Sequence, residues 1–312
     1  MVHPEIESSE SPQIHPTAIV DETARIGKGC RIGAYCIIGP GVELGEGNWV
    51  MEHAVVTSAA RLGKGNRIHH HAVIGGLPQD LKFHGEDSLV VIGDNNVFRE
   101  FVTVNGGTQF GGGVTRIGSN NLIMAQAHIA HDCQLGDGIV MGNNTMLAGH
   151  VTLQHFVTMG GGCAVHQFST IGRYSYLAGW TRVVQDIAPF LLVEGYNCKA
   201  RGINVVGLRR FGYDKPRIEQ LKQVFRLIFR SGEPRARALE LIESRGNIPE
   251  EAREIVAFLR SAEKGKSGRA REVQRARDRQ PAKGAEEWKA KRGALEGEDD
   301  QATPRGDSGS TN

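Results

Sequence analysis

The chain has 312 residues, a length that suits one large domain with a smaller one beside it. Its 37 Lys and Arg residues almost balance 35 Asp and Glu residues, so no overall charge favours nucleic acid or an anionic membrane surface. No run of about 18 apolar residues occurs, and the polar first 12 residues carry no apolar signal region, so we expect a cytoplasmic protein without membrane insertion. The 41 glycines and the 6% of aromatic residues indicate a backbone that turns often around a narrow aliphatic core.

A six-residue repeat follows a short N-terminal tail (1–13) and continues over residues 14–190. Aliphatic residues recur at every sixth position, as in Ile14, Val20 and Ile26, a spacing that an α-helix with its period of 3.6 residues would lose. Small residues stand four places after the aliphatic ones; four of them are cysteines, interpreted as buried core residues: Cys30, Cys36, Cys133 and Cys163. The repeat predicts a triangular coil of short parallel strands, in which three six-residue units close one turn of about 18 residues.

The repeat also predicts where loops leave the coil and which residues form its corners. The repeat loses its phase at about residues 76–91 and 105–116, and insertions into a solenoid loop out from one face, often the binding face. Gly and Asn suit the corners, where a left-handed backbone costs them least. The run His69–His71 is interpreted as a solvated corner.

The pattern changes after the repeat. Asp214 can cap a helix with Pro216 in its first turn, and two further helices are expected over 234–244 and 249–262. We therefore expect a helical domain at 191–263 that caps the open end of the prism. The segment 264–312 is charged and has few apolar clusters, and it is expected to be a disordered tail.

A column of histidines is the strongest chemical signal. Residues 18 apart stack on successive turns, and His131, His150 and His166 fall within one residue of a single column, with Gly149 directly beside His131. A histidine is a base with a near-neutral pKa, and an unhindered glycine N–H can hold an oxyanion, so the column has two parts of an acyl-transfer site. Asp132 could fix the tautomer of the preceding histidine.

Several motifs in order resemble one family. These are His128-Ile-Ala-His131-Asp132-Cys, Leu147-Ala-Gly-His150, Val165-His166-Gln167-Phe168, Gln79-Asp80-Leu81-Lys82 and Gly207-Leu-Arg-Arg-Phe-Gly212. Together they resemble the hexapeptide-repeat UDP-N-acetylglucosamine O-acyltransferases that begin lipid A synthesis. The resemblance implies a left-handed parallel β-helix with a C-terminal α-helical domain.

The resemblance also implies roles for individual residues. His131 would be the general base for the sugar 3-hydroxyl, Asp132 would orient it, and the Gly149 N–H would hold the oxyanion. Substrate-binding roles are implied for Gln79, Asp80, Lys82, His128, His150, His166, Gln167, Gly179, Asn204, Arg209 and Arg210; among these, Asn204 and Arg210 would meet the UDP phosphates and Gly179 would limit acyl-chain length.

The implied partners are UDP-N-acetylglucosamine, a 3-hydroxyacyl-acyl carrier protein and two further copies of the chain in a homotrimer. The protein itself would need no cofactor and no metal, because the donor carries a phosphopantetheine thioester.

Some positions depart from the family pattern and leave alternatives open. The turn Asn105-Gly106-Gly107-Thr108 lacks a usual basic side chain, Tyr196 and Asn197 replace more typical residues, and the bulky Trp180 follows Gly179. A 3-amino sugar thus remains an alternative acceptor. A zinc enzyme of the carbonic anhydrase type on the same fold, the sister N-acyltransferase and a non-catalytic scaffold are the rival interpretations.

Overall fold

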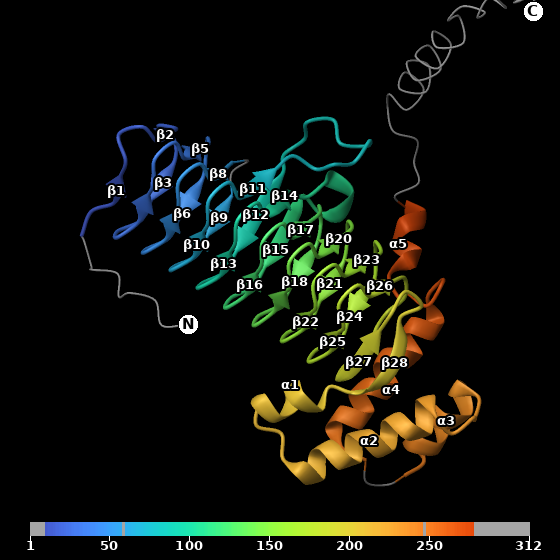
Figure 1. Cartoon of the computed structure of the whole chain (residues 1–312). Helices are drawn as coiled ribbons and strands as arrows, with labels where there is room; N and C mark the ends of the chain where they lie inside the picture. Colours follow the sequence, from blue (N-terminus) through green and yellow to red (C-terminus); the bar gives the residue numbers. More distant parts are fainter. Residues whose placement is uncertain (1–9, 58–59, 246–247, 278–312) are drawn as a thin grey trace, which may run out of the picture.

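The structure is a long prism of short parallel strands with helices beside its C-terminal end (Figure 1). It is a computed structural model that describes residues 10–57, 60–245 and 248–277. Most of the expected N-terminal tail and the last 35 residues of the expected C-terminal tail, 278–312, lie outside the described residues.

Three sheets form the walls of the prism. Sheet A consists of β1 (Gln13–Ile14), β4 (Arg31–Ile32), β7 (Trp49–Val50), β10 (Arg67–Ile68), β13 (Val97–Phe98), β16 (Leu122–Ile123), β19 (Val140–Met141), β22 (Thr158–Met159), β25 (Tyr176–Leu177), β27 (Leu191–Glu194) and β28 (Lys199–Ile203). Sheet B consists of β2 (Ile19–Val20), β5 (Ile37–Ile38), β8 (Val55–Val56), β11 (Val73–Gly76), β14 (Thr103–Asn105), β17 (His128–Ile129), β20 (Met146–Leu147), β23 (Ala164–Val165) and β26 (Arg182–Val183). Sheet C consists of β3 (Arg25–Ile26), β6 (Glu43–Leu44), β9 (Arg61–Leu62), β12 (Leu89–Ile92), β15 (Val114–Ile117), β18 (Gln134–Leu135), β21 (Thr152–Leu153) and β24 (Thr170–Ile171). The chain passes from sheet A to B to C in every coil, and we name the edges between them the A–B, B–C and C–A corners.

The core agrees with the six-residue repeat. The register pairs His128 of β17 with Met146 of β20, so adjacent coils are offset by the expected 18 residues. Aliphatic repeat positions such as Ile68 and Ile129 are fully buried, and all five cysteines are free and buried. Ile14 is 43% exposed, and Val20 and Ile26 are only partly buried, because they lie in the first coil, with a further coil on one side only.

The polar residues within the repeat form a ladder. Asn48, Asn66, Asn96 and Asn121 are almost completely buried. Each side-chain oxygen accepts the backbone N–H of the residue one coil further on, as from Asn66 to Asn48 at 2.8 Å and from Asn96 to Asn66 at 2.9 Å. Buried amides cost little when they are hydrogen-bonded in this way, which explains why asparagine can replace a small apolar residue here.

Both insertions leave the prism at the same corner. The first (residues 77–88) connects β11 to β12 and the second (106–113), with the short 3-10 helix η1 (Gln109–Gly111), connects β14 to β15, so each joins sheet B to sheet C. They are shorter than the expected 76–91 and 105–116, because β12 and β15 extend to four residues each and pair along their whole length. The prediction that the insertions emerge on one face is confirmed.

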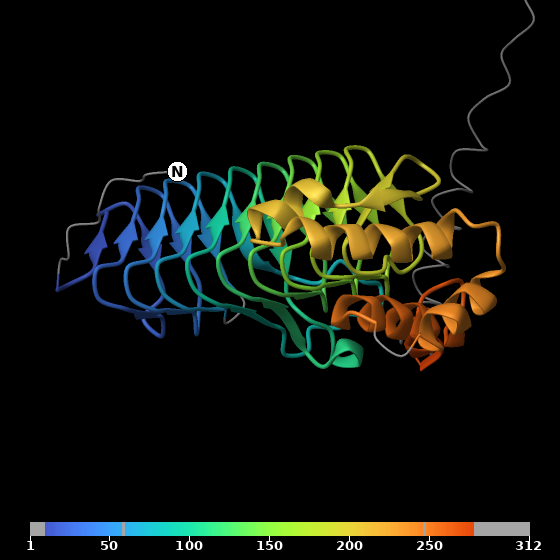
Figure 2. The same ribbon diagram turned by 90° about the horizontal axis from the view of Figure 1, so that it is seen from below.

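The C-terminal domain does not begin with a helix. Strands β27 and β28 form an antiparallel hairpin that extends sheet A, which corrects the expected all-helical 191–263. Four helices follow: α1 (Val205–Arg210), α2 (Lys215–Phe229), α3 (Arg235–Glu243) and α4 (Glu250–Lys264). Asp214 caps α2 through the N–H of Arg217, as predicted. Figure 2 shows α1 and α2 lying along the flank of the last coils, so the domain covers a side of the prism as well as its end.

The chain after α4 packs against the prism, contrary to the expected disorder from residue 264. We call residues 265–277, which end in α5 (Glu272–Arg277), the strap. The N–H of Ala270 donates to Asp186 Oδ2 at 2.8 Å, and Arg271 reaches the carbonyl of His150 at 2.9 Å. The strap is held by polar bonds, which leave no apolar periodicity for a sequence pattern to reveal. None of the helices within the described residues is long and apolar enough to cross a bilayer.

Candidate active site

The site is centred on a hydrogen-bonded histidine–aspartate pair at the B–C corner. His131 and Asp132 follow β17, and the Nδ1 atom of His131 lies 2.7 Å from Asp132 Oδ2. Asp132 occupies the left-handed region with φ 61°, as do His150 and Phe168 at the same corner of the next two coils. This conformation costs a non-glycine residue about 1 kcal/mol or more, and here the repeat imposes it in three successive coils.

The second insertion covers the carboxylate of Asp132. Thr108 donates its N–H to Oδ1 at 2.8 Å and its hydroxyl to Oδ2 at 2.7 Å. Asp132 is 2% exposed as a result. The histidine column points out of the prism, as predicted, but its members are covered by neighbouring segments, and His150 is only 6% exposed. An ionised Asp132 in this setting holds His131 with Nδ1 protonated and leaves Nε2 free to accept a proton.

Gly149 lies directly against the ring of His131, as the 18-residue register predicts. A Cβ atom added to Gly149 would lie 2.4 Å from Cε1 and 2.6 Å from Nε2 of that ring. In the described part of the chain the N–H groups of Ala148 and His150 donate backbone hydrogen bonds, whereas the N–H of Gly149 between them donates none. The free nitrogen of His131 and an available N–H group therefore lie side by side.

Two further aromatic rings support His131. The ring of His150 meets it edge-on with centroids 5.2 Å apart, and stacks on Phe168 at 4.4 Å. The Nε2 atom of His150 lies 3.6 Å from Asp132 Oδ2. Because these rings come from three successive coils, the prism itself sets their spacing.

His128 faces outward from β17 on the same coil. Its Nδ1 atom lies 2.8 Å from the hydroxyl of Thr103 on the preceding coil. Burial lowers the pKa of His128, and the neighbouring His131 lowers it further. His128 is therefore neutral near pH 7 and can serve as a hydrogen-bonding group beside the base.

The column continues toward the C-terminal end of the prism. His166 and Gln167 follow β23 one coil beyond Gly149, and the His166 ring bonds the carbonyl of Gln167 at 3.0 Å. Gly179 lies at the A–B corner, one coil after Gly161. The indole of Trp180 is 80% exposed and lies flat against Gly162, so it packs along the corner.

The first insertion brings a charged pair near the same corner. Lys82 Nζ lies 3.9 Å from Asp80 Oδ2 and 5.7 Å from the ring of Phe110 in the second insertion. The first insertion is also tied to the end of β14, where the side chain of Asn105 donates to the carbonyl of Leu77 at 2.9 Å. Gln79 is exposed on this loop.

The residues expected to meet the UDP phosphates lie at a different corner. Asn204 caps α1, with its Oδ1 accepting from Gly207 and its Nδ2 donating to the carbonyl of Tyr174 at 2.9 Å. Tyr174 belongs to the C–A corner, and Arg209 and Arg210 are exposed in the last turn of α1. A single chain therefore does not bring them to His131.

Comparison with known proteins decides the family. The family described as "Udp N-acetylglucosamine O-acyltransferase; Domain 2" matches residues 186–267, and the bacterial transferase hexapeptide family matches residues 114–149. The acyl-[acyl-carrier-protein]--UDP-N-acetylglucosamine O-acyltransferase of Anaeromyxobacter dehalogenans is 47% identical over 252 residues, which cover 81% of this chain and 98% of that protein. The chain belongs to the UDP-N-acetylglucosamine O-acyltransferase family.

Further relatives agree with this assignment. The protein of the same name from Stenotrophomonas maltophilia is 42% identical over 258 residues, covering 82% of this chain and 98% of that one. Crystal structures of UDP-N-acetylglucosamine acyltransferases from Bacteroides fragilis and Francisella novicida align with TM-scores of 0.77 and 0.76, at 38% and 36% identity. They cover 80% and 79% of this chain, and 97% and 91% of those chains. The predicted left-handed β-helix with a C-terminal helical domain and the acyltransferase class are confirmed.

Among the residues that the structure describes, two sets of side chains could approach a metal ion. His131, Asp132 and His150 form one set, and His69, His70 and Glu100 form the other, each with ligand atoms within 4.8 Å of one another. In the first set Asp132 already accepts bonds from Thr108 and His131. In the second, Glu100 accepts from Arg99 and pairs with His69 at 3.2 Å. The interpretation of the histidine run as a solvated corner is therefore wrong for His69, whereas His71 is exposed as expected. The comparisons do not support the zinc-enzyme alternative or the 3-amino acceptor.

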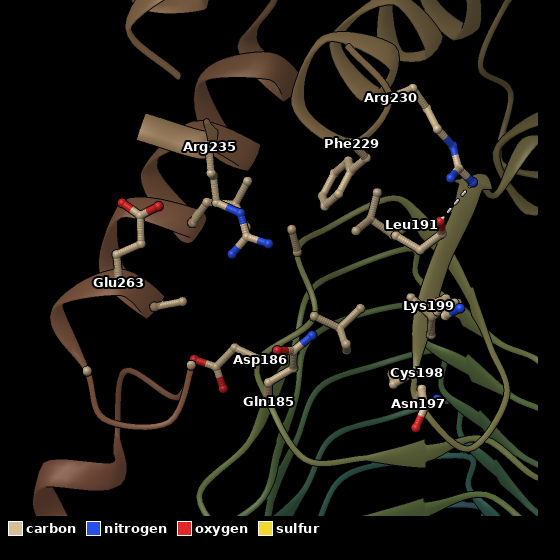
Figure 3. Close-up of a pocket in the computed structure, with 18 residues that line it drawn as sticks. Gln185, Asp186, Leu191, Asn197, Cys198, Lys199, Phe229, Arg230, Arg235 and Glu263 are labelled. Atoms are coloured by element: carbon tan, nitrogen blue, oxygen red, sulfur yellow. Dashed lines mark hydrogen bonds between the residues drawn. The ribbon is translucent and has the colours of Figure 1, made fainter. Parts of the chain in front are cut away.

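A cavity of 430 Å³ lies away from the histidines. It is lined by the last coil, the β27–β28 hairpin, α2, α3, α4 and the start of the strap. Figure 3 shows Asp186 and Gln185 facing it from the prism, and Arg235 and Glu263 from the helices. It separates the helical domain from the prism end and does not contain the base.

Four contributors to the site escaped the sequence analysis. The hydroxyl of Thr103 bonds the ring of His128, and the hydroxyl of Thr115 accepts the N–H of Asp132. Thr108 donates to the carboxylate of Asp132, and Arg271 donates to the carbonyl of His150. Thr103 directly precedes Val104, which keeps the six-residue spacing of the aliphatic residues. Thr103 could therefore have been found by continuing the repeat across the second insertion. The other contacts depend on where a loop and the strap fold back, which no spacing reveals.

Proposed function

We propose that this chain transfers a 3-hydroxyacyl group from acyl carrier protein to the 3-hydroxyl group of UDP-N-acetylglucosamine, the reaction that begins lipid A synthesis. The observation that carries the proposal is the placement of the free Nε2 of His131 beside the N–H of Gly149. The sequence relatives named for this reaction support the choice of substrates.

The base acts at His131. Its Nε2 takes the proton of the sugar 3-hydroxyl as that oxygen attacks the carbonyl carbon of the thioester, and Asp132 stabilises the resulting imidazolium through Nδ1. When the tetrahedral intermediate collapses, the C–S bond breaks and the imidazolium returns its proton to the leaving thiolate. The ester product and the free thiol of the carrier protein balance the reaction.

The oxyanion is held by the N–H of Gly149. This donor has no backbone acceptor among the described residues and lies next to the base, so it can meet the negative charge that develops on the thioester oxygen. Gln79, Asp80, Lys82, His128, His150, His166 and Gln167 surround this corner and position the sugar and the acyl chain.

A homotrimer completes the site. Asn204, Arg209 and Arg210 lie at the C–A corner and His131 at the B–C corner of the same chain, so one nucleotide sugar can reach both sets only if a second copy supplies one of them. Three copies arranged around a threefold axis would give three equal sites, each between neighbours. The cytoplasm is the expected location, where acyl carrier protein and nucleotide sugars are available.

The activity is tested with purified full-length chain and defined substrates. We expect ester formation with UDP-N-acetylglucosamine and 3-hydroxyacyl-acyl carrier protein, measured by mass spectrometry of the sugar product, with much slower reaction of the 3-amino analogue. Light scattering on the same sample should give three chains per particle. Transfer to the amino sugar alone, or no transfer with any carrier-bound donor, would contradict the proposal.

Acyl-chain selection is expected to depend on Gly179. An added Cβ there would lie 3.3 Å from the carbonyl oxygen of Gly161, a tight contact that a shift of a few tenths of an ångström relieves. Gly179→Met should lower kcat/KM for long donors by about fourfold for each excluded methylene, since each is worth about 0.8 kcal/mol, and leave short donors unchanged. Gly202→Met is the matched control, because nothing lies within 4 Å of its added Cβ. An equal loss for all donors would assign Gly179 a structural role.

A further inference from the structure

The strap forms a second layer over the end of the histidine column. In Figure 1, α5 stands beside the C-terminal coils of sheet B, at the side that carries the B–C corner. The family match at the C-terminal domain ends at residue 267, so most of the strap lies beyond it. Two arginines, Arg269 and Arg271, attach it to the prism.

Arg269 and Asp186 anchor the strap. Asp186 is 8% exposed; its N–H donates to the carbonyl of Gly268 at 2.8 Å, and its Oδ2 accepts from the N–H of Ala270. Arg269 and Glu272 are 6% and 7% exposed and pair at 2.8 Å, and Arg269 also bonds the carbonyl of Val184. Buried pairs with several hydrogen bonds hold one geometry, because breaking them leaves charges without partners.

Arg271 extends from this anchored segment to the site. One of its guanidinium nitrogens donates to the carbonyl oxygen of His150 at 2.9 Å and also bonds the hydroxyl of Thr152. The N–H of His150 donates to the carbonyl of His131 at 3.0 Å. The backbone of His150, held at φ 62°, is therefore fixed on one side by the base and on the other by the strap.

The position held in this way is central to the chemistry. His150 directly follows Gly149, whose N–H is the proposed oxyanion donor, and its ring contacts His131. Arg271 holds the carbonyl group of His150, so a shift there would displace the ring of His150, which contacts the base, and the backbone of the preceding Gly149. Catalytic groups must be held to within a fraction of an ångström, and supporting residues commonly do this.

We propose that Arg271 is a positioning residue for acyl transfer and that the strap seats it against the carbonyl group of His150, the residue that follows Gly149. This role rests on the proposed function. Arg271 touches no reacting atom in this account and acts only through the corner that it holds.

The test compares Arg271→Met, which keeps most of the side-chain length without the donors, with Arg271→Lys and with Val273→Ala. Val273 is a control on the same helix, because its side chain is 60% exposed. We expect Arg271→Met to lower kcat about tenfold while KM for both substrates changes less than about twofold, which is the pattern of an interaction that matters in the transition state. Arg271→Lys should recover part of the rate, and Val273→Ala should match the parent.

Truncation gives an independent measurement. A chain that ends at Lys264 should show the same loss of kcat as Arg271→Met, whereas a chain that ends at Arg277 should keep the parent rate. Light scattering and thermal unfolding are measured on every variant. An active parent whose Arg271→Met and Lys264-truncated forms keep their kcat would overturn the positioning role alone.

Two other outcomes would also overturn it. A loss of kcat that accompanies dissociation of the oligomer would assign Arg271 to assembly. A parent chain without any acyl transfer would contradict the proposed function and the positioning role together. Because the parent is assayed first, this outcome is distinguished from a failure of the positioning role alone.

Discussion

Replacement of His131 by alanine is expected to lower kcat by at least about 10²-fold, the usual scale for the loss of a general base. The ring accepts the sugar proton through Nε2, while Asp132 holds Nδ1 at 2.7 Å. Its side chain is outside the prism core, so the variant should fold and assemble as the parent does. The rate is measured with saturating substrates, so that the change reports on chemistry.

The control for this variant is His155→Ala. His155 is another histidine of a prism corner, but it lies at the C–A corner with a 55% exposed side chain paired to Asp137 at 3.2 Å. It should keep the parent kcat and a similar melting temperature. Near-normal turnover of the intact His131→Ala oligomer would remove His131 as the base.

Gly149→Ala is expected to have an effect of similar size for a different reason. The glycine has no left-handed φ, so alanine fits the backbone, but its Cβ would lie 2.4 Å from the His131 ring. The ring can rotate away more cheaply than the backbone can move, so the variant should fold while the base leaves its position. A displacement of about 1 Å can cost about 10²-fold in rate, and we expect a loss of that order in kcat.

Gly202→Ala is the matched control, because it adds the same methyl group at a place with no atom within 4 Å. Activity and thermal unfolding of both variants are compared with those of the parent. A Gly149→Ala chain with parent-like kcat would show that neither the ring nor the N–H of residue 149 is needed where the structure has it.

Much of this fold and site was determined by the sequence by itself. A period of six with an aliphatic residue at each repeat is satisfied when neighbouring strands lie 18 residues apart wherever no insertion intervenes, so the register of those coils follows from counting. The same count brings His131 against Gly149 and aligns them with His150. The insertions are predicted on one face because insertions into a solenoid loop out from one face.

The tertiary structure alone decided how this corner is enclosed. Thr108 reaches Asp132 because the second insertion folds back onto it, and the bonds concerned join residues 24 apart in the sequence and off the repeat. The strap was mistaken for a disordered tail because charged residues without apolar periodicity show no buried face. Its anchors, Asp186 and Arg269, become visible only when both segments are in place.

The division of the site between corners also belongs to the tertiary structure. Sequence motifs place Arg209 and Arg210 in the same function as His131, but only the packing of α1 against Phe156 and Tyr174 shows that they occupy another edge. A repeat dictates local spacing along the prism axis, because each coil contacts only its neighbours. Where a helix, a loop or a strap returns to that surface depends on side-chain complementarity over long sequence distances, and this is the part that only the folded structure decides.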